Sequence, residues 1–283
     1  MIRIDPDKIM QHIKEVSQLH ILPRFYDLKP EHVERKSDRS LVTIADKEAE
    51  SALTKRLLDL LPGSKVVGEE AFAADSSILS RFFDESPVWI IDPVDGTSNF
   101  ASGNREFGVI VALAKQNQIL AGWIYDPTSD EVVTAEAGSG AYFKGKKLSV
   151  LPSRPIEEMF GVLSSAIIGP YRKSGQSASP GQPVFEAMKA GAHEYPRLVI
   201  DAPHFGKTAP QAIHFRAGLT QTNSWDDAAG VLIHREAGGY SATWAGDPYS
   251  IQVNDRGLLL APDRDSWREL KNWCGSFCKL PLG

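Results

Sequence analysis

The hydrophobic pattern of the first sixty residues predicts two amphipathic helices, because apolar residues recur at three- and four-residue intervals. The first helix is expected over residues 6–22, and Pro23 is expected to end it. Its apolar face comprises Ile9, Ile13, Val16 and Leu19. The second helix is expected to start with a capping box formed by Thr43 and Asp46. Its apolar face comprises Ala49, Leu53, Leu57 and Leu60.

From residue 65 onward, short apolar runs separated by polar turns favour strands. The apolar run at residues 88–91 predicts a buried strand, and Pro93 is expected to end it because proline has a fixed φ and no N–H. Residues 108–137 predict an antiparallel meander. Residues 182–190 suit a helix, and a further helix is expected from Trp225 to a C-cap at Gly238 and Gly239.

Composition and charge exclude several classes of protein. The chain has 283 residues, of which 42% are hydrophobic and 24% charged, an ordinary globular composition. Its formal net charge of -5 gives no electrostatic case for binding a nucleic acid polymer. No apolar run reaches membrane-spanning length, and the N-terminus lacks the apolar core of a signal peptide. A cytoplasmic protein without a membrane partner is therefore expected.

Residues 151–155 have the composition of a linker and predict two packed parts. We expect an N-terminal α+β subdomain over residues 1–151 and a C-terminal α/β subdomain over residues 152–283. The cysteines Cys274 and Cys278 lie one helical turn apart near the C-terminus. Two reduced thiols are expected there, because no further cysteine is present to complete a zinc site.

The strand at residues 88–91 leads directly into Asp92-Pro93-Val94-Asp95-Gly96-Thr97. The carboxylates of Asp92 and Asp95 lie close across a tight bend and repel each other if both are ionised. A divalent cation such as Mg²⁺, which takes oxygen ligands, is the simplest compensation. Gly96 and the following backbone N–H groups can cradle an anion. Because Asp, Pro and Gly are also common turn residues, this fragment alone predicts a turn and a metal site about equally.

The longer stretch over residues 88–100 resembles the first signature of the inositol monophosphatase family, which are Mg²⁺-dependent, lithium-sensitive phosphatases. Three further segments resemble the family in the same order. They are Lys36 with Val42-Thr43-Ile44-Ala45-Asp46, then Gly68-Glu69-Glu70, then Trp225-Asp226-Asp227-Ala228-Ala229-Gly230. Taken singly, Asp46 is a first-turn acid, Glu69 a solvated acid and Asp226 an N-cap. The chain departs from the family at Ala71, where Ser or Thr is usual, and around residues 190–195.

The resemblance implies a layered α/β (α+β) fold of the αβαβα, sugar-phosphatase-like type, with two mainly antiparallel sheets. It implies two or three Mg²⁺ ions. By position, the metal ligands are Glu69, Asp92, the Val94 carbonyl, Asp95 and Asp226. The residues that orient the attacking water are Asp46 and Thr97. The substrate-binding residues are Gly96, Thr97 and Asp226, and Lys36 belongs to a flap.

The function that the resemblance implies is hydrolysis of a small phosphate monoester by in-line attack of a metal-activated water. The partner is a small phosphorylated substrate, and a homodimer is left open. Activity on 3′-phosphoadenosine 5′-phosphate, histidinol phosphate or fructose bisphosphate remains an alternative. A ligand-binding protein on the same fold is the alternative outside enzymes.

Specificity for inositol phosphate is not expected. Family members with that specificity carry an acid shortly before the Trp-Asp motif, and Leu219 stands at that position here. Arg216 is expected to be a solvated surface residue or, alternatively, to contact a second anionic group of the substrate. A structural histidine is favoured over a substrate contact at His193. The remaining candidates, His204, His214 and His234, show no metal-ligand spacing.

Overall fold

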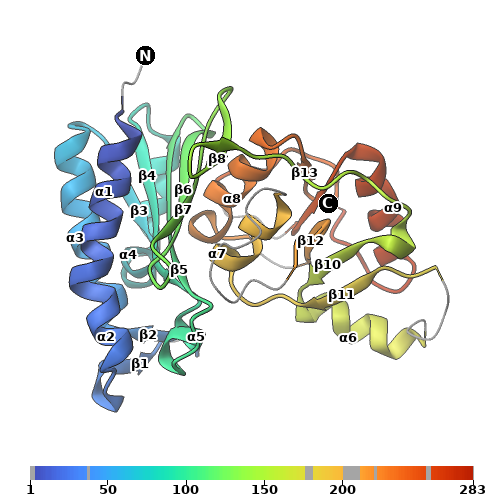
Figure 1. Ribbon diagram of the computed structural model, residues 1–283, viewed down its shortest axis with the longest axis horizontal. Coiled ribbons are helices and arrows are strands. Elements are labelled where there is room, and N and C mark those ends of the chain that lie inside the picture. The colour runs from blue at the N-terminus through green and yellow to red at the C-terminus, as the bar shows by residue number, and fades with distance from the viewer. Residues whose placement is uncertain are drawn as a thin grey trace.

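The computed structural model describes residues 4–36, 39–175, 181–199, 211–219, 222–252 and 256–282. Helices and two large sheets alternate in five layers, in the order αβαβα (Figure 1). The fold class expected from the sequence is therefore confirmed.

The N-terminal helices form the first layer. Helix α1 (Pro6–Val16) continues through a π-helical turn (Ser17–Ile21) into α2 (Leu22–Tyr26), and α3 spans Ile44–Leu60. The expected end at Pro23 is wrong, because the chain stays helical to Tyr26. Pro23 lies in the first turn of α2, where a missing N–H costs little. The expected capping box of Thr43 and Asp46 is present at the start of α3.

The first sheet has seven strands in the order β3-β4-β5-β6-β7-β8-β9. Their bounds are Lys65–Gly68, Val88–Asp95, Gly108–Lys115, Gln118–Asp126, Glu131–Glu136, Gly140–Phe143 and Lys146–Lys147. Strands β3 and β4 are parallel, and the other neighbours are antiparallel, which confirms the expected meander. A separate hairpin of β1 (Val33–Arg35) and β2 (Leu41–Thr43) leads into α3.

The second sheet has five strands in the order β11-β10-β12-β14-β13. Their bounds in that order are Val184–Ala187, Phe160–Leu163, Phe215–Gly218, Leu258–Ala261 and Tyr240–Ala242. Strand β10 is parallel to β11 and β12, whereas β14 is antiparallel to β12 and β13, so this sheet is mixed rather than mainly antiparallel as expected. The helix expected over residues 182–190 is wrong, because pairing with β10 draws this segment into β11 and overrides its local preference.

Helix α8 (Ser224–Glu236) lies between the two sheets, beside the short α7 (Gly191–Glu194) (Figure 1). Along β4, Trp89 and Ile91 pack with α1 and α3, while Ile90 packs on the opposite face with α8. On the far face of the second sheet, α6 (Ser165–Ser174) and α9 (Arg264–Gly275) close a third apolar cluster. Because apolar layers cover α8 on both sides, its first turn is held between the sheets.

The remaining helices of the described residues are short. They are α4 (Glu69–Ala74), α5 (Thr97–Ala101) and 3₁₀ turns at Pro30–His32, Ser76–Phe83, Ile156–Glu158 and Pro196–Leu198. Among the helices of the described ranges, none combines the length and the apolar character needed to cross a bilayer. Cys274 and Cys278 are both free, as expected; both are also buried, and Cys278 lies beyond the end of α9.

Candidate active site

Two carboxylates, Asp92 and Asp95, flank a bulge at the carboxyl end of β4. The pairing with β5 runs to Asp92 opposite Ile110, shifts, and resumes at Asp95 opposite Gly108. The expectation that Pro93 ends this strand is therefore wrong, since Pro93 sits inside the bulge, where no ladder N–H is needed. In a regular strand, side chains three residues apart point to opposite faces. The extra residue of the bulge lets both carboxylates reach the same point.

Asp226 reaches the same point from the first turn of α8. The N-cap of this helix is Asn223 rather than Asp226, and Asn223 Nδ2 donates to Asp226 Oδ2 at 3.0 Å. Carboxylate oxygens of Asp92, Asp95 and Asp226 lie within 4.8 Å of one another. Within the part of the chain that the structure describes, this is the one group of three or more His, Cys, Asp or Glu side chains with ligand atoms so close.

Burial and mutual repulsion raise the pKa values of all three carboxyls. Burial raises the pKa of Asp92 well above its usual range, and the charges of Glu69, Asp95 and Asp226 raise it further. Burial raises the pKa of Asp95 to about 7, although the Ala192 N–H donates to its Oδ2 at 2.7 Å. Burial and the charge of Asp95 raise the pKa of Asp226 as well. A divalent cation would relieve this repulsion, and the all-oxygen donor set fits a hard cation such as Mg²⁺.

Glu69 and Lys36 lie beside this group of three rather than within it. Glu69 begins α4, and Lys36 Nζ is 2.8 Å from both Glu69 Oε1 and Glu70 Oε1. Burial by itself would lower the pKa of Lys36, but the two carboxylates raise that pKa above its usual value, so Lys36 is a cation. Glu50, which no motif marks in the sequence, accepts the N–H groups of Glu70 and Ala71 through its carboxylate, each at 2.8 Å, and so holds the start of α4.

Thr97 and Asp46 form a hydrogen-bonded pair near the acidic group. Thr97 Oγ1 lies 3.1 Å from Asp46 Oδ1 and 3.0 Å from the Val94 carbonyl oxygen. Its single proton serves one of these acceptors at a time. Burial raises the pKa of Asp46 to about 6, although Asp46 accepts hydrogen bonds from both Thr43 and Thr97. A carboxylate with that pKa can accept a proton near neutral pH.

Gly96 turns the chain from β4 into α5. Its φ of +87° is in the left-handed region, and a Cβ there would lie 2.8 Å from the carbonyl oxygen of Glu106. Only glycine tolerates both conditions without strain. The turn delivers Thr97 as the first residue of α5, within reach of Asp46 on α3.

Both expectations for Arg216 are wrong. Its side chain is 9% exposed, and its guanidinium pairs with Glu194 and Asp227. It is therefore neither solvated nor available to a substrate anion. No local spacing in the sequence connects Arg216 with Glu194 and Asp227. The N-cap residue Asn223, by contrast, could have been found from its place three residues before Asp226, where an N-cap is expected.

Leu219, His193 and His214, which the sequence singled out, make contacts within the fold. Leu219 packs against the apolar cluster of α6 and α9. His193 is buried, with its Nε2 3.0 Å from the carbonyl oxygen of Phe107, in keeping with the expected structural place. His214 accepts the Phe160 N–H through Nδ1, and His204 lies outside the described residues.

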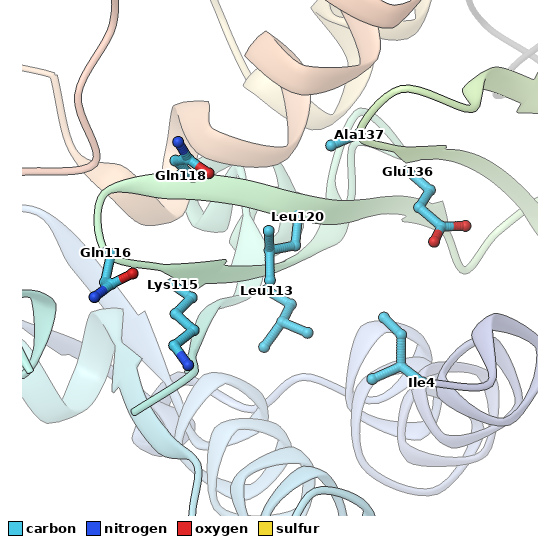
Figure 2. Close-up of a pocket in the computed structure, with 8 residues that line it drawn as sticks. All are labelled: Ile4, Leu113, Lys115, Gln116, Gln118, Leu120, Glu136 and Ala137. Carbon is cyan, nitrogen blue, oxygen red and sulfur yellow. The ribbon is translucent and has the colours of Figure 1, made fainter. Parts of the chain in front are cut away.

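The structure also has a hollow of about 360 Å³, whose lining side chains are drawn in Figure 2. Its lining residues are Ile4, Leu113, Lys115, Gln116, Gln118, Leu120, Glu136 and Ala137. Lys115 ends β5, whereas Gly108 at its start pairs with Asp95. At about 3.3 Å per residue, β5 separates the two places by roughly 23 Å. The hollow therefore does not belong to the carboxylate group.

Comparisons of the sequence and of the fold with known proteins point to one family. Residues 9–279 match the model of the inositol monophosphatase family. An inositol-1-monophosphatase of Bacillus subtilis (strain 168) is 31% identical over 224 residues, which cover 78% of this chain and 80% of that protein. The Nus factor SuhB of Vibrio cholerae is 30% identical over 230 residues, covering 80% of each protein. In fold, the chain resembles the solved IMPase of Thermotoga maritima with a TM-score of 0.76 at 22% identity, covering 96% of this chain and 98% of that one.

Proposed function

Since this chain belongs to the inositol monophosphatase family, a family of phosphatases, we propose that it hydrolyses small phosphate monoesters with Mg²⁺ as its cofactor. The observation that carries the proposal is the group of Asp92, Asp95 and Asp226. Three carboxylates so close together in a buried place are costly unless a cation joins them. Such sites commonly serve phosphoryl transfer, in which negative charge must be stabilised.

We assign Glu69, Asp92 and the Val94 carbonyl to one ion, and Asp92, Asp95 and Asp226 to a second, with a third left open. Asp92 would then serve both ions, in keeping with its place as the most buried of the three clustered carboxylates, 2% exposed. When bound, such ions lower the pKa of a water and stabilise charge on the attacking and leaving oxygens.

The chain's own groups orient and deprotonate the attacking water in this proposal. If the Thr97 hydroxyl donates to Asp46, its oxygen lone pairs stay free to accept a hydrogen bond from that water. A water proton can then move to Thr97 as the Thr97 proton moves to Asp46. The raised pKa of Asp46, about 6, suits this final acceptor.

Binding of the phosphate would use the turn that follows β4. The backbone N–H groups of Gly96 and Thr97 would hold phosphate oxygens, as N–H groups at a helix start do in anion sites. Asp226 would also contact the substrate. Lys36, a cation beside Glu69, would belong to the flap formed by the β1–β2 hairpin.

Removal of divalent metal is the direct test of the proposal. Chelator-treated protein is expected to lose phosphatase activity by at least about 100-fold, because the clustered carboxylates alone repel an anionic phosphate. Added Mg²⁺ should restore the activity, and Li⁺ should inhibit it. Mg²⁺ should also raise the melting temperature of the metal-free protein, since a ligand of the folded state stabilises that state. Full activity in excess chelator would contradict the metal assignment.

The substrate is expected to be a small phosphate ester without strong preference for inositol 1-phosphate. By sequence position Leu219 replaces the acid that would accept hydrogen bonds from ring hydroxyls, and its side chain packs with the apolar cluster of α6 and α9 instead. A site that lacks such partners discriminates weakly among polyols. The measurement is kcat/KM for inositol 1-phosphate beside glycerol 2-phosphate, histidinol phosphate, fructose 1,6-bisphosphate and 3′-phosphoadenosine 5′-phosphate. A clear preference for inositol 1-phosphate over all the others would show that another residue supplies the missing acid.

A further inference from the structure

Arg216, Glu194, Asp227 and Tyr195 form a buried ion cluster that has no part in the proposed reaction. Arg216 on β12 donates through Nε to Glu194 Oε2 of α7 at 2.8 Å, and through Nη1 to Asp227 Oδ1 of α8 at 3.1 Å. The exposed fractions of the three side chains are 9%, 3% and 6%. One guanidinium therefore joins three elements that are separate in the sequence.

Tyr195 completes the cluster. Its hydroxyl donates to Asp227 Oδ1 at 2.6 Å and lies 3.3 Å from Arg216 Nη1. Its ring lies under the guanidinium, whose Cζ is 4.6 Å from the ring centroid. The ring also lies against α8 at Gly230, where a Cβ would be 2.1 Å from the Tyr195 Cγ atom. Tyr195 thus contacts both Arg216 and the backbone of α8.

The same two helices, α7 and α8, carry contacts to the proposed metal ligands. On α7, the Ala192 N–H donates to Asp95 Oδ2 at 2.7 Å. Gly191, the first residue of α7, lies so near Asp226 that a Cβ there would be 3.1 Å from the Asp226 carbonyl oxygen. On α8, Asp227 directly follows Asp226. The ion cluster therefore ties the element that holds Asp95 to the element that carries Asp226.

We propose that Arg216 is a positioning residue that fixes the distance between Asp95 and Asp226 by clamping α7 to α8, and thereby sets the affinity of the site for divalent cations. This inference rests on the proposed function for the assignment of Asp95 and Asp226 as ligands. Arginine is required because its planar fork bonds two carboxylates in fixed directions, whereas a lysine ammonium acts as a point charge. Groups that orient metal ligands typically change metal affinity when they are replaced.

The positive charge of Arg216, taken by itself, would lower the affinity of the site for divalent cations. A buried cation near the site repels Mg²⁺, so a guanidinium that acted by charge alone would weaken metal binding. Under that alternative, Arg216→Met would bind divalent cations more tightly, and Arg216→Lys would leave binding unchanged. Under the positioning role, both replacements weaken binding because both remove the fork.

The experiment measures Mg²⁺ binding to the metal-free full-length chain by calorimetry, with thermal unfolding as the check on folding. Arg216→Lys is expected to bind Mg²⁺ about tenfold more weakly than the parent. Its phosphatase activity should recover partly at high Mg²⁺. The matched control is Arg56→Lys, which makes the same change in an ion pair with Glu15 between α1 and α3, and should keep the parent affinity within about twofold. Parent affinity in Arg216→Lys, or tighter binding in Arg216→Met, would overturn the inference.

If Arg216→Lys shows no cooperative unfolding, Tyr195→Phe decides the question. It removes one hydroxyl from the cluster and is expected to weaken Mg²⁺ binding about fivefold. Unchanged Mg²⁺ binding in folded Tyr195→Phe would then overturn the inference. A parent protein that binds Mg²⁺ but hydrolyses no phosphate ester would overturn the proposed function and leave this inference standing, because its measured quantity is metal affinity.

Discussion

Asp92→Asn is expected to lower kcat/KM for phosphate ester hydrolysis by about 10³-fold or more, since metal ions contribute several kcal/mol of transition-state stabilisation and each 1.36 kcal/mol is a factor of ten. Asp92 is the carboxylate assigned to both ions. Asparagine keeps the shape of the side chain and an oxygen that can accept the Val94 N–H, a contact of 3.0 Å in the parent. The substitution therefore removes a charged ligand with little change of packing.

The folding of Asp92→Asn separates a lost ligand from a damaged structure. Burial and neighbouring acids raise the pKa of Asp92, so its ionised form destabilises the metal-free fold, and the variant should melt no lower than the metal-free parent. Its stabilisation by Mg²⁺ should be lost. The matched control is Asp126→Asn, at a fully buried aspartate that accepts the Thr128 N–H at the end of β6 and is not among the proposed metal ligands. Near-parent turnover by Asp92→Asn would refute the bridging assignment.

Thr97→Ala is expected to lower kcat by about 10²–10⁴-fold with little change in KM, the range for a positioned proton acceptor. The pair of Thr97 and Asp46 orients and deprotonates the water mainly in the transition state, so its loss acts on kcat. Asp46→Asn should act in the same direction. It also disturbs the cap of α3, however, so Thr97→Ala is the cleaner change.

The control for this pair is Thr97→Ser, which keeps the hydroxyl and should retain most of kcat. The measurement is full kinetics at saturating Mg²⁺, beside thermal unfolding of each variant. If Thr97→Ala altered KM and left kcat intact, Thr97 would be a substrate contact rather than part of a proton path.

Local sequence signals predicted the elements whose contacts are local. The capping box of Thr43 and Asp46 and the glycine C-cap of α8 depend on neighbours within a few residues, and both are present. The meander that follows β4, which pairs strands consecutive in the chain, is present as well. The errors arose where distant pairing decided the outcome. Residues 184–187 became a strand beside β10, and β4 continued past Pro93 by placing that residue in a bulge against β5.

By itself, the sequence determined the family and the candidate carboxylates, because the motifs around Asp92, Asp95 and Asp226 are contiguous strings that can be read in order. Only the tertiary structure decided which acids meet. It brought Asp226 to Asp92 and Asp95 and left Glu69 beside them, paired with Lys36. It also buried Arg216 between Glu194 and Asp227. Residues that meet from separate strands and helices show no periodic spacing in the sequence, because their contact depends on how the layers pack.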